Sequence, residues 1–365
     1  MIAWLLISFF VLLFLGVPIA MSLGLSAIGG ILFLGGGSTV TIAQRMFEGM
    51  NSFALLAIPL YTFAGFTMSK GGISKRLMDF CYSIVGHIYG GLAHVNVLSS
   101  MIFAGISGSA VADTAGVSGM FMPEMVRKGY SKNFTVAVTA ISSTIGIIVP
   151  PSIPMVVIAG ICGISTGKLF LGGIIPGILC GLAQMIVSYF MAKKEGVPKE
   201  PGHFTIGPVL HGLWESWPAL LMPIIIVGTI TMGIVSPTEA GVIAVVYGLF
   251  AGGIIYRELK WEDIKFAFAE TVRTSGRIFI VIGAAKLYTV MLTTAGFDKW
   301  VAKTMLGFST NPTVILIMIL LIFFIVTMFM ESIATLTLFM PILYPIALGV
   351  GINPIVLSVL ITVVI

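Results

Sequence analysis

Two stretches rich in serine, glycine and proline could bind ions, at residues 105–116 and 142–154. These residue types disfavour helix interiors, because serine competes for backbone partners, glycine loses entropy and proline lacks an N–H donor. No Asp, Glu, Lys or Arg occurs from Asn133 to Gly167, so the tandem prolines at 150 and 151 interrupt an apolar span. Irregular backbone at membrane depth survives only where protein or a watery cavity covers it. Broken helices there present carbonyls to a cation and helix N-termini to an anion, which is transporter chemistry.

The oxygen atoms of these two stretches are candidate ligands for sodium. Sodium is a hard cation that prefers oxygen, and unwound backbone together with serine hydroxyls supplies it. Packing of serine between membrane helices is the alternative interpretation. We expect the two stretches to meet around one ion, with their ligand oxygens within about 5 Å of each other. The candidate ligands are Ser107, Gly108, Ser109, Ala110, Gly146, Val149 and Pro151.

Three hydroxyl groups lie directly before the second of these breaks. Half-helix N-termini at the breaks would point toward an anion beside the ion, and hydroxyl donors suit the same anion. We therefore expect Ser142, Ser143 and Thr144 to hold the carboxylate of a substrate.

Two acidic residues lie in apolar surroundings, where a charged side chain costs about 2.5–3.5 kcal/mol on insertion scales. Asp113, with Thr114 beside it, is expected to cap the second helix of a hairpin, and direct ion binding is the alternative. Glu331 allows the same two roles. A second candidate ion site comprises Met330, Glu331, Ser332 and Thr335.

The composition is that of a polytopic helical membrane protein. Of the 365 residues, 58% are hydrophobic and 9% charged, with a mean hydropathy of +1.12. A soluble domain carries about 25% charged residues. The net charge of +5 comes from short Lys and Arg clusters between apolar spans, as the positive-inside bias predicts, and it needs no nucleic-acid partner.

The N-terminal 44 residues carry no charged side chain, which predicts a retained membrane segment in place of a signal peptide. This stretch is long for one span of about 20 residues, and Gly16-Val17-Pro18 would kink it or split it in two. Because the first positive residue is Arg45, we expect the N-terminus outside the cytoplasm. Apolar residues on one face of 39–50 predict a short helix in the membrane interface.

Further apolar spans are expected near 53–69, 77–104, 132–162, 168–192, 217–235, 238–256, 278–296, 311–330 and 333–365. Residues 258–277 instead predict an amphipathic helix on the membrane surface, while Pro237-Thr238-Glu239 is typical of a helix start. The predicted organisation is 1–52 as N-terminal membrane segments with the interfacial helix, 53–192 as a first repeat with a hairpin tip and a broken helix, 193–208 as a cytoplasmic linker, and 209–365 as a second repeat, incomplete at its C-terminus.

The two predicted repeats resemble each other weakly. Residues 71–77 correspond to 295–301, and in each half an acid, Asp113 or Glu331, stands ten residues before a proline. Paired interrupted spans in corresponding positions indicate a binding site.

At these residues the chain resembles the large membrane subunit of tripartite ATP-independent periplasmic (TRAP) transporters, within the ion-transporter superfamily. The resemblance runs along essentially the whole chain. It rests on the motifs Ile106–Thr114, Met122–Met125 with Gly129-Tyr130, Gly146–Pro154, Ser236–Gly241 and Met330–Ser332.

The resemblance implies an all-α polytopic fold of two inverted repeats, with helical hairpins, discontinuous membrane helices and an elevator motion. It implies sodium-coupled uptake of an organic acid, such as sialic acid, a C4-dicarboxylate or a sugar acid, across the bacterial inner membrane. A periplasmic binding protein and a small four-helix membrane subunit would be the partners. Sodium would be the coupling ion, with no other cofactor.

The family's second Gly-x-x-x-Pro-Pro break is missing before the sequence stops at Ile365, as expected of either a fragment or a natural truncation. The second ion site would then lack one wall. Another anion symporter of the superfamily, and a channel or structural subunit, are alternatives. Gly163-Ile164-Ser165-Thr166-Gly167 fits the nucleophile elbow of a serine hydrolase, but it joins two apolar helical spans, so we expect no enzyme. No Walker A motif occurs, so ATP cannot drive transport from this chain.

Overall fold

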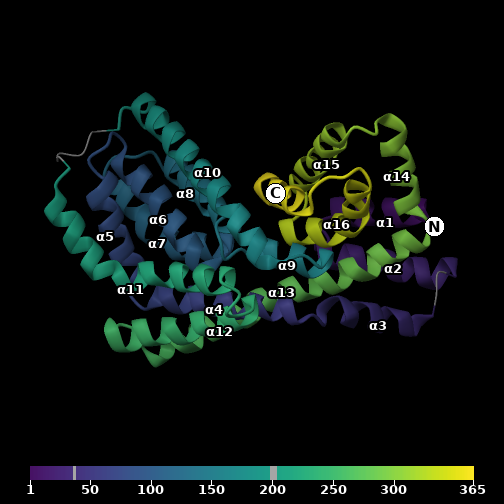
Figure 1. Ribbon diagram of the computed structural model, residues 1–365, viewed down its shortest axis with the longest axis horizontal. Coiled ribbons are helices and arrows are strands. Elements are labelled where there is room, and N and C mark those ends of the chain that lie inside the picture. The colour runs from purple at the N-terminus through teal and green to yellow at the C-terminus, as the bar shows by residue number, and fades with distance from the viewer. Residues whose placement is uncertain (36–37, 198–203) are drawn as a thin grey trace. The chain divides into compact units, whose positions relative to one another are not determined.

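The computed structural model describes residues 1–35, 38–197 and 204–365, which are helical with no strand (Figure 1). This confirms the predicted all-α class. The helices of the first part are α1 (Ile2–Phe14), α2 (Ile19–Leu34), α3 (Thr39–Met50), α4 (Ala57–Lys70), α5 (Ile73–Val85), α6 (Gly91–Ser107), α7 (Ala110–Arg127), α8 (Lys132–Ser143), α9 (Ile153–Cys162) and α10 (Thr166–Lys194). They are followed by α11 (Ile206–Thr231), α12 (Pro237–Phe250), α13 (Trp261–Thr294), α14 (Phe297–Phe308), α15 (Pro312–Thr327), α16 (Ser332–Gly349) and α17 (Pro354–Val364). Short turns of 3₁₀-helix lie at Phe53–Leu56 (η1) and Thr144–Ile147 (η2), and a π-helical turn (η3) extends α12 over Ala251–Ile255.

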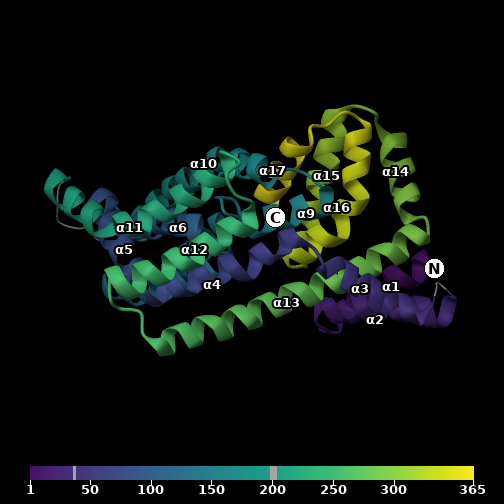
Figure 2. The same cartoon turned by 60° about the horizontal axis from the view of Figure 1, so that its bottom comes forward.

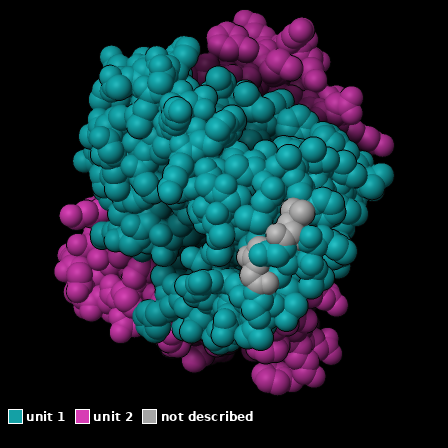
Figure 3. All heavy atoms as spheres, turned by 90° about the vertical axis from the view of Figure 1, so that its right-hand side faces the viewer, with its two compact units in different colours: residues 1–56, 154–166, 274–365 teal, residues 57–153, 167–273 magenta. Residues whose placement is uncertain are grey.

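The chain forms two compact units, each assembled from separate pieces of sequence (Figure 3). Unit 1 comprises Met1–Leu56, Pro154–Thr166 and Thr274–Ile365, and unit 2 comprises Ala57–Ile153 and Gly167–Arg273. The predicted division into repeats on either side of a linker at 193–208 stays a prediction. Residues 198–203 of that linker lie outside the described residues.

Six described helices are long and apolar enough to cross a membrane, so the chain is an integral membrane protein. They are Phe53–Lys70, Thr166–Lys194, Ile206–Thr231, Pro237–Ile255, Trp261–Thr294 and Ser332–Gly349. The uncharged N-terminal stretch is split, because Gly16 adopts a left-handed conformation (φ 81°) and α2 begins directly after Pro18. With 13 residues, α1 is about 20 Å long, shorter than the roughly 30 Å hydrocarbon core.

The core of unit 1 joins the N-terminal helices to the second half of α13. Leu5 and Leu23 are fully buried in one apolar cluster with Leu287 and Met291 of α13. The Tyr288 hydroxyl donates a hydrogen bond of 2.8 Å to the Leu5 carbonyl. In the same unit, α16 packs against α14, α15 and α17, and Figure 2 shows α14, α15 and α16 side by side.

Three expected boundaries were wrong. The expected single span at 333–365 is two helices, α16 and α17, because Gly351 adopts a left-handed conformation and α17 starts at Pro354. The expected surface helix at 258–277 and the expected span at 278–296 form one continuous helix, α13, because no proline interrupts them and a glycine alone does not end a helix. The expected single span at 77–104 is two helices, α5 and α6. The turn between them needs glycine, since a Cβ at Gly91 would lie 2.0 Å from the Gly86 carbonyl oxygen and Gly90 has a φ of 75°.

Helices α5, α6 and α7 correspond in length to α14, α15 and α16, and a left-handed glycine precedes the first helix of each series. Gly72 (φ 79°) precedes α5 and Gly296 (φ 81°) precedes α14. The next helices have 17 and 16 residues (α6 and α15), and those after them have 18 each (α7 and α16). This correspondence supports an internal repeat, while its inverted orientation stays a prediction.

Candidate functional site: a hairpin tip against a broken helix

The hairpin in unit 2 consists of α6 and α7, and its tip is a two-residue turn. Ser107 ends α6, Gly108 adopts a left-handed conformation (φ 62°), and Ser109 caps α7 by accepting a hydrogen bond from the Ala112 N–H at 3.4 Å. Glycine is required in this turn because a Cβ on Gly108 would lie 2.3 Å from the Pro151 carbonyl oxygen. Serine at the N-cap satisfies one donor that the helix start leaves unpaired.

The break in the second stretch lies between α8 and α9. The turn η2 follows Ser143, and the chain is then irregular through Val149, Pro150 and Pro151 until α9 begins at Ile153. The Ser152 hydroxyl donates to the Ile147 carbonyl across this break. Proline supplies no N–H here, so carbonyls on the preceding turn are left without the partners that a continuous helix would give them.

The hairpin tip and the break are in direct contact, as the sequence predicts. The Ile153 N–H donates a hydrogen bond of 3.0 Å to the Gly108 carbonyl. A Cβ placed on Gly146 would lie 3.3 Å from both the Ser109 carbonyl oxygen and the Ala110 nitrogen. The candidate sodium ligands Ser107, Gly108, Ser109, Ala110, Gly146, Val149 and Pro151 therefore belong to two turns that touch each other. Their role as ligands stays a prediction.

Replacing Gly108 with alanine should destabilise unit 2. The left-handed backbone strains any residue with a Cβ by about 1–3 kcal/mol, and the new methyl group would overlap the Pro151 carbonyl. We expect a lower thermal midpoint for the purified protein in detergent. Gly119→Ala is the matched control on α7, since nothing lies within 4 Å of a Cβ there. Equal midpoints for the two variants would contradict the tight contact at the tip.

A buried network of hydrogen bonds lies between α6 and α8. The Asn96 amide donates to the Thr139 hydroxyl at 2.8 Å, and its carbonyl oxygen accepts from the Ser142 hydroxyl at 2.9 Å. The Ser100 hydroxyl donates to Ser142 at 3.2 Å, and the Ser143 hydroxyl to the Thr139 carbonyl at 2.8 Å. All five side chains are buried, so this network fixes how α6 packs against α8 in the part of the hairpin that precedes the Gly108 turn.

Asp113 is fully buried beside this network, and neither of its carboxylate oxygens has a hydrogen-bond partner. The Ser100 and Ser143 hydroxyls face the carboxylate without meeting hydrogen-bond geometry. The expected hairpin cap at Asp113 and Thr114 was wrong, because α7 begins one turn earlier and Ser109 caps it. The Thr114 hydroxyl donates to the Ala110 carbonyl, within the helix. A buried carboxylate is costly when charged, and a bound cation or a proton at Asp113 would lower that cost.

The three hydroxyls expected to hold a substrate differ in exposure. Ser142 and Ser143 are buried and donate within the protein, whereas Thr144 is exposed and donates to the Ile141 carbonyl at 2.7 Å. Only Thr144 is therefore at a surface, and a substrate-binding role for the three stays a prediction.

The second candidate ion site lies in unit 1 at the start of α16. Glu331 caps this helix and accepts hydrogen bonds from the Ile333 and Ala334 N–H groups at 3.1 and 3.2 Å. The Thr335 hydroxyl donates to the Glu331 carbonyl, and Met330 is buried. The cap role expected for Glu331 is confirmed, while ion binding by Met330, Glu331, Ser332 and Thr335 stays a prediction. Glu331 is the N-cap of α16, as Ser109 is the N-cap of α7, so these two residues occupy equivalent positions. The predicted equivalence of Glu331 with Asp113 was therefore wrong, because Asp113 lies one helical turn after the cap.

Other local predictions agree with the structure. Ser236 and Glu239 form a reciprocal capping box at the start of α12, with Pro237 as the first helical residue. The helix expected over 39–50 is α3, which has no buried residue, while its place in the membrane interface stays a prediction. The Gly163–Gly167 motif joins α9 to α10, so it lacks the strand that a nucleophile elbow requires.

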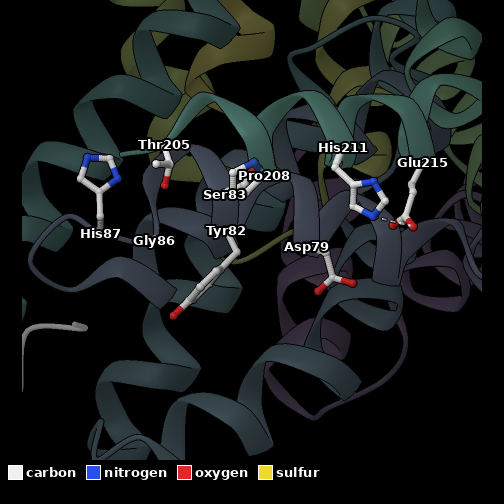
Figure 4. Close-up of a pocket in the computed structure, with 10 residues that line it drawn as sticks. Asp79, Tyr82, Ser83, Gly86, His87, Thr205, Pro208, His211 and Glu215 are labelled. Atoms are coloured by element: carbon white, nitrogen blue, oxygen red, sulfur yellow. Dashed lines mark ion pairs between the residues drawn. The ribbon is translucent and has the colours of Figure 1, made fainter. Parts of the chain in front are cut away.

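A cavity of about 380 Å³ lies between α5 and α11 in unit 2 (Figure 4). His211 pairs with Glu215 at 3.2 Å near Asp79, and Figure 4 shows His87 at the opposite end. Across the described ranges, no three His, Cys, Asp or Glu side chains are grouped to hold a metal ion. His94, seven residues from His87, is buried, and its Nε2 atom lies 3.2 Å from the Tyr89 carbonyl oxygen.

Lys286 was not among the residues predicted from sequence, although it is the single charged residue in the apolar second half of α13. A lysine in such a span costs about 2.5–3.5 kcal/mol on insertion scales and marks a functional site by default. The side chain is half-buried and faces a cavity in unit 1.

Residues 6–365 match the family described as "Tripartite ATP-independent periplasmic transporter, DctM component". The chain belongs to this family. It is 38% identical to the isethionate TRAP transporter permease protein of Oleidesulfovibrio alaskensis over 347 residues, which cover 95% of the chain and 55% of that protein. It is 36% identical to the sialic acid TRAP transporter large permease protein of Vibrio cholerae, covering 94% of the chain and 80% of that protein. The C4-dicarboxylate TRAP transporter large permease protein of Pseudomonas aeruginosa is also 36% identical, with the same coverage.

Membership of this family makes the chain a transporter permease and not an enzyme, so the hydrolase alternative is excluded. The chain spans about half the length of the isethionate relative and about four fifths of the other two.

Proposed function

We propose that this chain is the large membrane component of a transporter that uses a sodium gradient to take up a small organic acid. The observation that carries the proposal is the contact between the hairpin tip at Gly108 and the broken helix at Gly146. Two interrupted helices that meet inside an apolar region suit alternating access around a fixed site better than an open pore.

The residues at this contact fit sodium by their chemistry. Serine hydroxyls and backbone carbonyls are hard oxygen donors, and the set contains no nitrogen or sulfur donor that would favour a transition metal. Asp113 lies in α7, the helix that Ser109 caps, and its carboxylate oxygens lack hydrogen-bond partners. A nearby cation would offset the charge of this carboxylate. A bound sodium ion would be held by Ser107, Gly108, Ser109, Ala110, Gly146, Val149 and Pro151. A second ion at Met330, Glu331, Ser332 and Thr335 belongs to the same proposal.

The solute class follows from what the relatives' names share. Isethionate is a sulfonate, whereas sialic acid and C4-dicarboxylates are carboxylates. The common element is a small organic anion with an oxygen-acid head, so the class is broader than the carboxylate expected from sequence. Ser142, Ser143 and Thr144 are proposed contacts for that head.

The partners and location complete the proposal. A tripartite transporter implies two further components, which we take to be a periplasmic binding protein and a small membrane subunit. The protein is located in the bacterial inner membrane, with its N-terminus on the periplasmic side. Transport proceeds by an elevator motion of one part of the protein.

Uptake should require all three components. We expect proteoliposomes with this chain, the small subunit and the binding protein to accumulate radiolabelled solute. Omission of either partner should lower the rate to background, because the binding protein delivers the solute and the small subunit supports the large one. Accumulation of free solute at an undiminished rate by this chain alone would contradict the tripartite assignment.

A further inference from the structure

The lysine on α13 projects into a cavity built entirely from unit 1. The cavity has a volume of about 190 Å³, which leaves room for several water molecules or a small anionic group. Its walls come from α3, α9, α13 and α16, and its polar lining comes from Glu48, Ser52, Lys286 and Thr337. Gly160 and Pro341 also line the cavity.

Small residues create the close approach of α3 to α13 at this cavity. A Cβ at Gly49 would lie 2.6 Å from the Cβ of Lys286, so only glycine leaves room for the lysine stem. On the next turn of α13, a Cβ at Gly283 would lie 3.2 Å from the Met46 carbonyl oxygen. The two helices are therefore held together at the position where Lys286 enters the cavity.

The charges around the cavity do not cancel. Arg45 donates a hydrogen bond of 2.7 Å to Glu48, and this bond holds the pKa of Glu48 below its ordinary value. Lys286 lowers the same pKa by its charge, yet in the described chain it forms no ion pair within 4.0 Å. With Glu48 neutralised by Arg45, one positive charge is left facing the cavity. The Thr337 hydroxyl donates to the Ile333 carbonyl. The half-buried Ser52 side chain lines the same cavity, and within the described residues its hydroxyl donates no hydrogen bond.

We propose that this cavity binds the anionic head of a small organic acid, with Lys286 as the counter-charge and Ser52 as a hydroxyl donor. An ammonium group with three donors and a hydroxyl donor lining the same cavity suit a carboxylate and a sulfonate equally well. The site rests on the proposed function for its ligand class. It adds a cationic contact in unit 1 to the hydroxyl contacts expected in unit 2.

The test is ligand-dependent thermal unfolding of the purified full chain in detergent, with isethionate, succinate and N-acetylneuraminate as probes. At least one probe should stabilise the unaltered protein, and Lys286→Met should raise its apparent Kd at least about tenfold. Ser52→Ala should raise it about 2- to 10-fold through the lost hydrogen bond. Glu48→Gln should tighten binding because it removes the one negative charge at the cavity. Lys303→Met, an exposed lysine of α14, is the control for bulk charge and should leave binding unchanged.

The outcomes separate this site from the proposed function. Equal stabilisation of the unaltered protein and Lys286→Met would overturn the site while leaving anion transport intact. Weaker anion binding in Glu48→Gln would also overturn it, because removal of a negative charge beside Lys286 must favour an anion if the lysine is its counter-charge. Stabilisation by no probe, together with uptake by the complete transporter, would refute this site alone, whereas loss of both would refute the function as well. If Lys286→Met does not fold, the binding affinities of Ser52→Ala and Glu48→Gln test the site instead. Each of these substitutions removes only one hydroxyl oxygen or one charge from the cavity lining.

Discussion

Uptake falls to background when choline replaces sodium outside proteoliposomes that hold the complete transporter. The expectation follows from the oxygen-only donor set at the contact between the hairpin tip and the broken helix, which suits a hard monovalent cation and not the bulky choline ion. The chain has no Walker A motif, so this subunit offers no nucleotide-driven alternative. The initial rate of solute uptake is measured with each cation at equal ionic strength.

A substitution at the tip localises this sodium requirement. Ser107→Ala should raise the sodium concentration for half-maximal uptake, because Ser107 contributes a candidate ligand oxygen at the end of α6. Ser99→Ala is the matched control, a buried serine on the same helix about two turns away. Undiminished uptake in choline would refute sodium coupling. An unchanged sodium dependence in Ser107→Ala would assign Ser107 to helix packing.

Strong local signals made much of the fold predictable from sequence. Gly16-Val17-Pro18 splits the N-terminal stretch, and Ser236 with Glu239 starts α12, because these residue types act through their own backbone or through neighbours three positions away. The boundary inside 77–104 was missed because apolar content alone does not distinguish one span from two helices joined by a glycine turn. The continuity of α13 was missed because a change from amphipathic to apolar composition does not require a break in the helix.

The candidate site was predictable where backbone chemistry defines it and less so where packing defines it. Clusters of glycine, serine and proline identified both turns, and their contact followed from the need to satisfy backbone groups at membrane depth. The cap was misplaced because the first turn of α7 accommodates either Ser109 or Asp113 by residue type, and only the three-dimensional turn at Gly108 decides. Lys286 carried a clear signal, a single charge in an apolar span, but its cavity depends on α3, α9 and α16, which lie far from it in sequence.

Replacing Gly146 with valine should lower coupled uptake strongly while leaving the protein folded. A Cβ at this position already lies 3.2–3.3 Å from the Ser109 carbonyl group and the Ala110 nitrogen, and valine adds two further methyl groups. The added volume must push the hairpin tip away from the break. Functional constellations tolerate displacements of about 0.5 Å, so we expect the sodium-dependent uptake rate to fall by more than about tenfold.

The matched control is Gly228→Val on α11 of the same unit, where nothing lies within 4 Å of a Cβ. Both variants place a β-branched residue in an apolar region, so any general cost of valine is shared between them. The control should retain uptake, and both proteins should elute as single species in detergent. Sodium should raise the thermal midpoint of the control but not that of Gly146→Val, because only the second has its ligand turns forced apart. If Gly146→Val keeps both its sodium-dependent stabilisation and its uptake, the ion lies elsewhere, and the contact between Gly108 and Gly146 serves only to pack the hairpin.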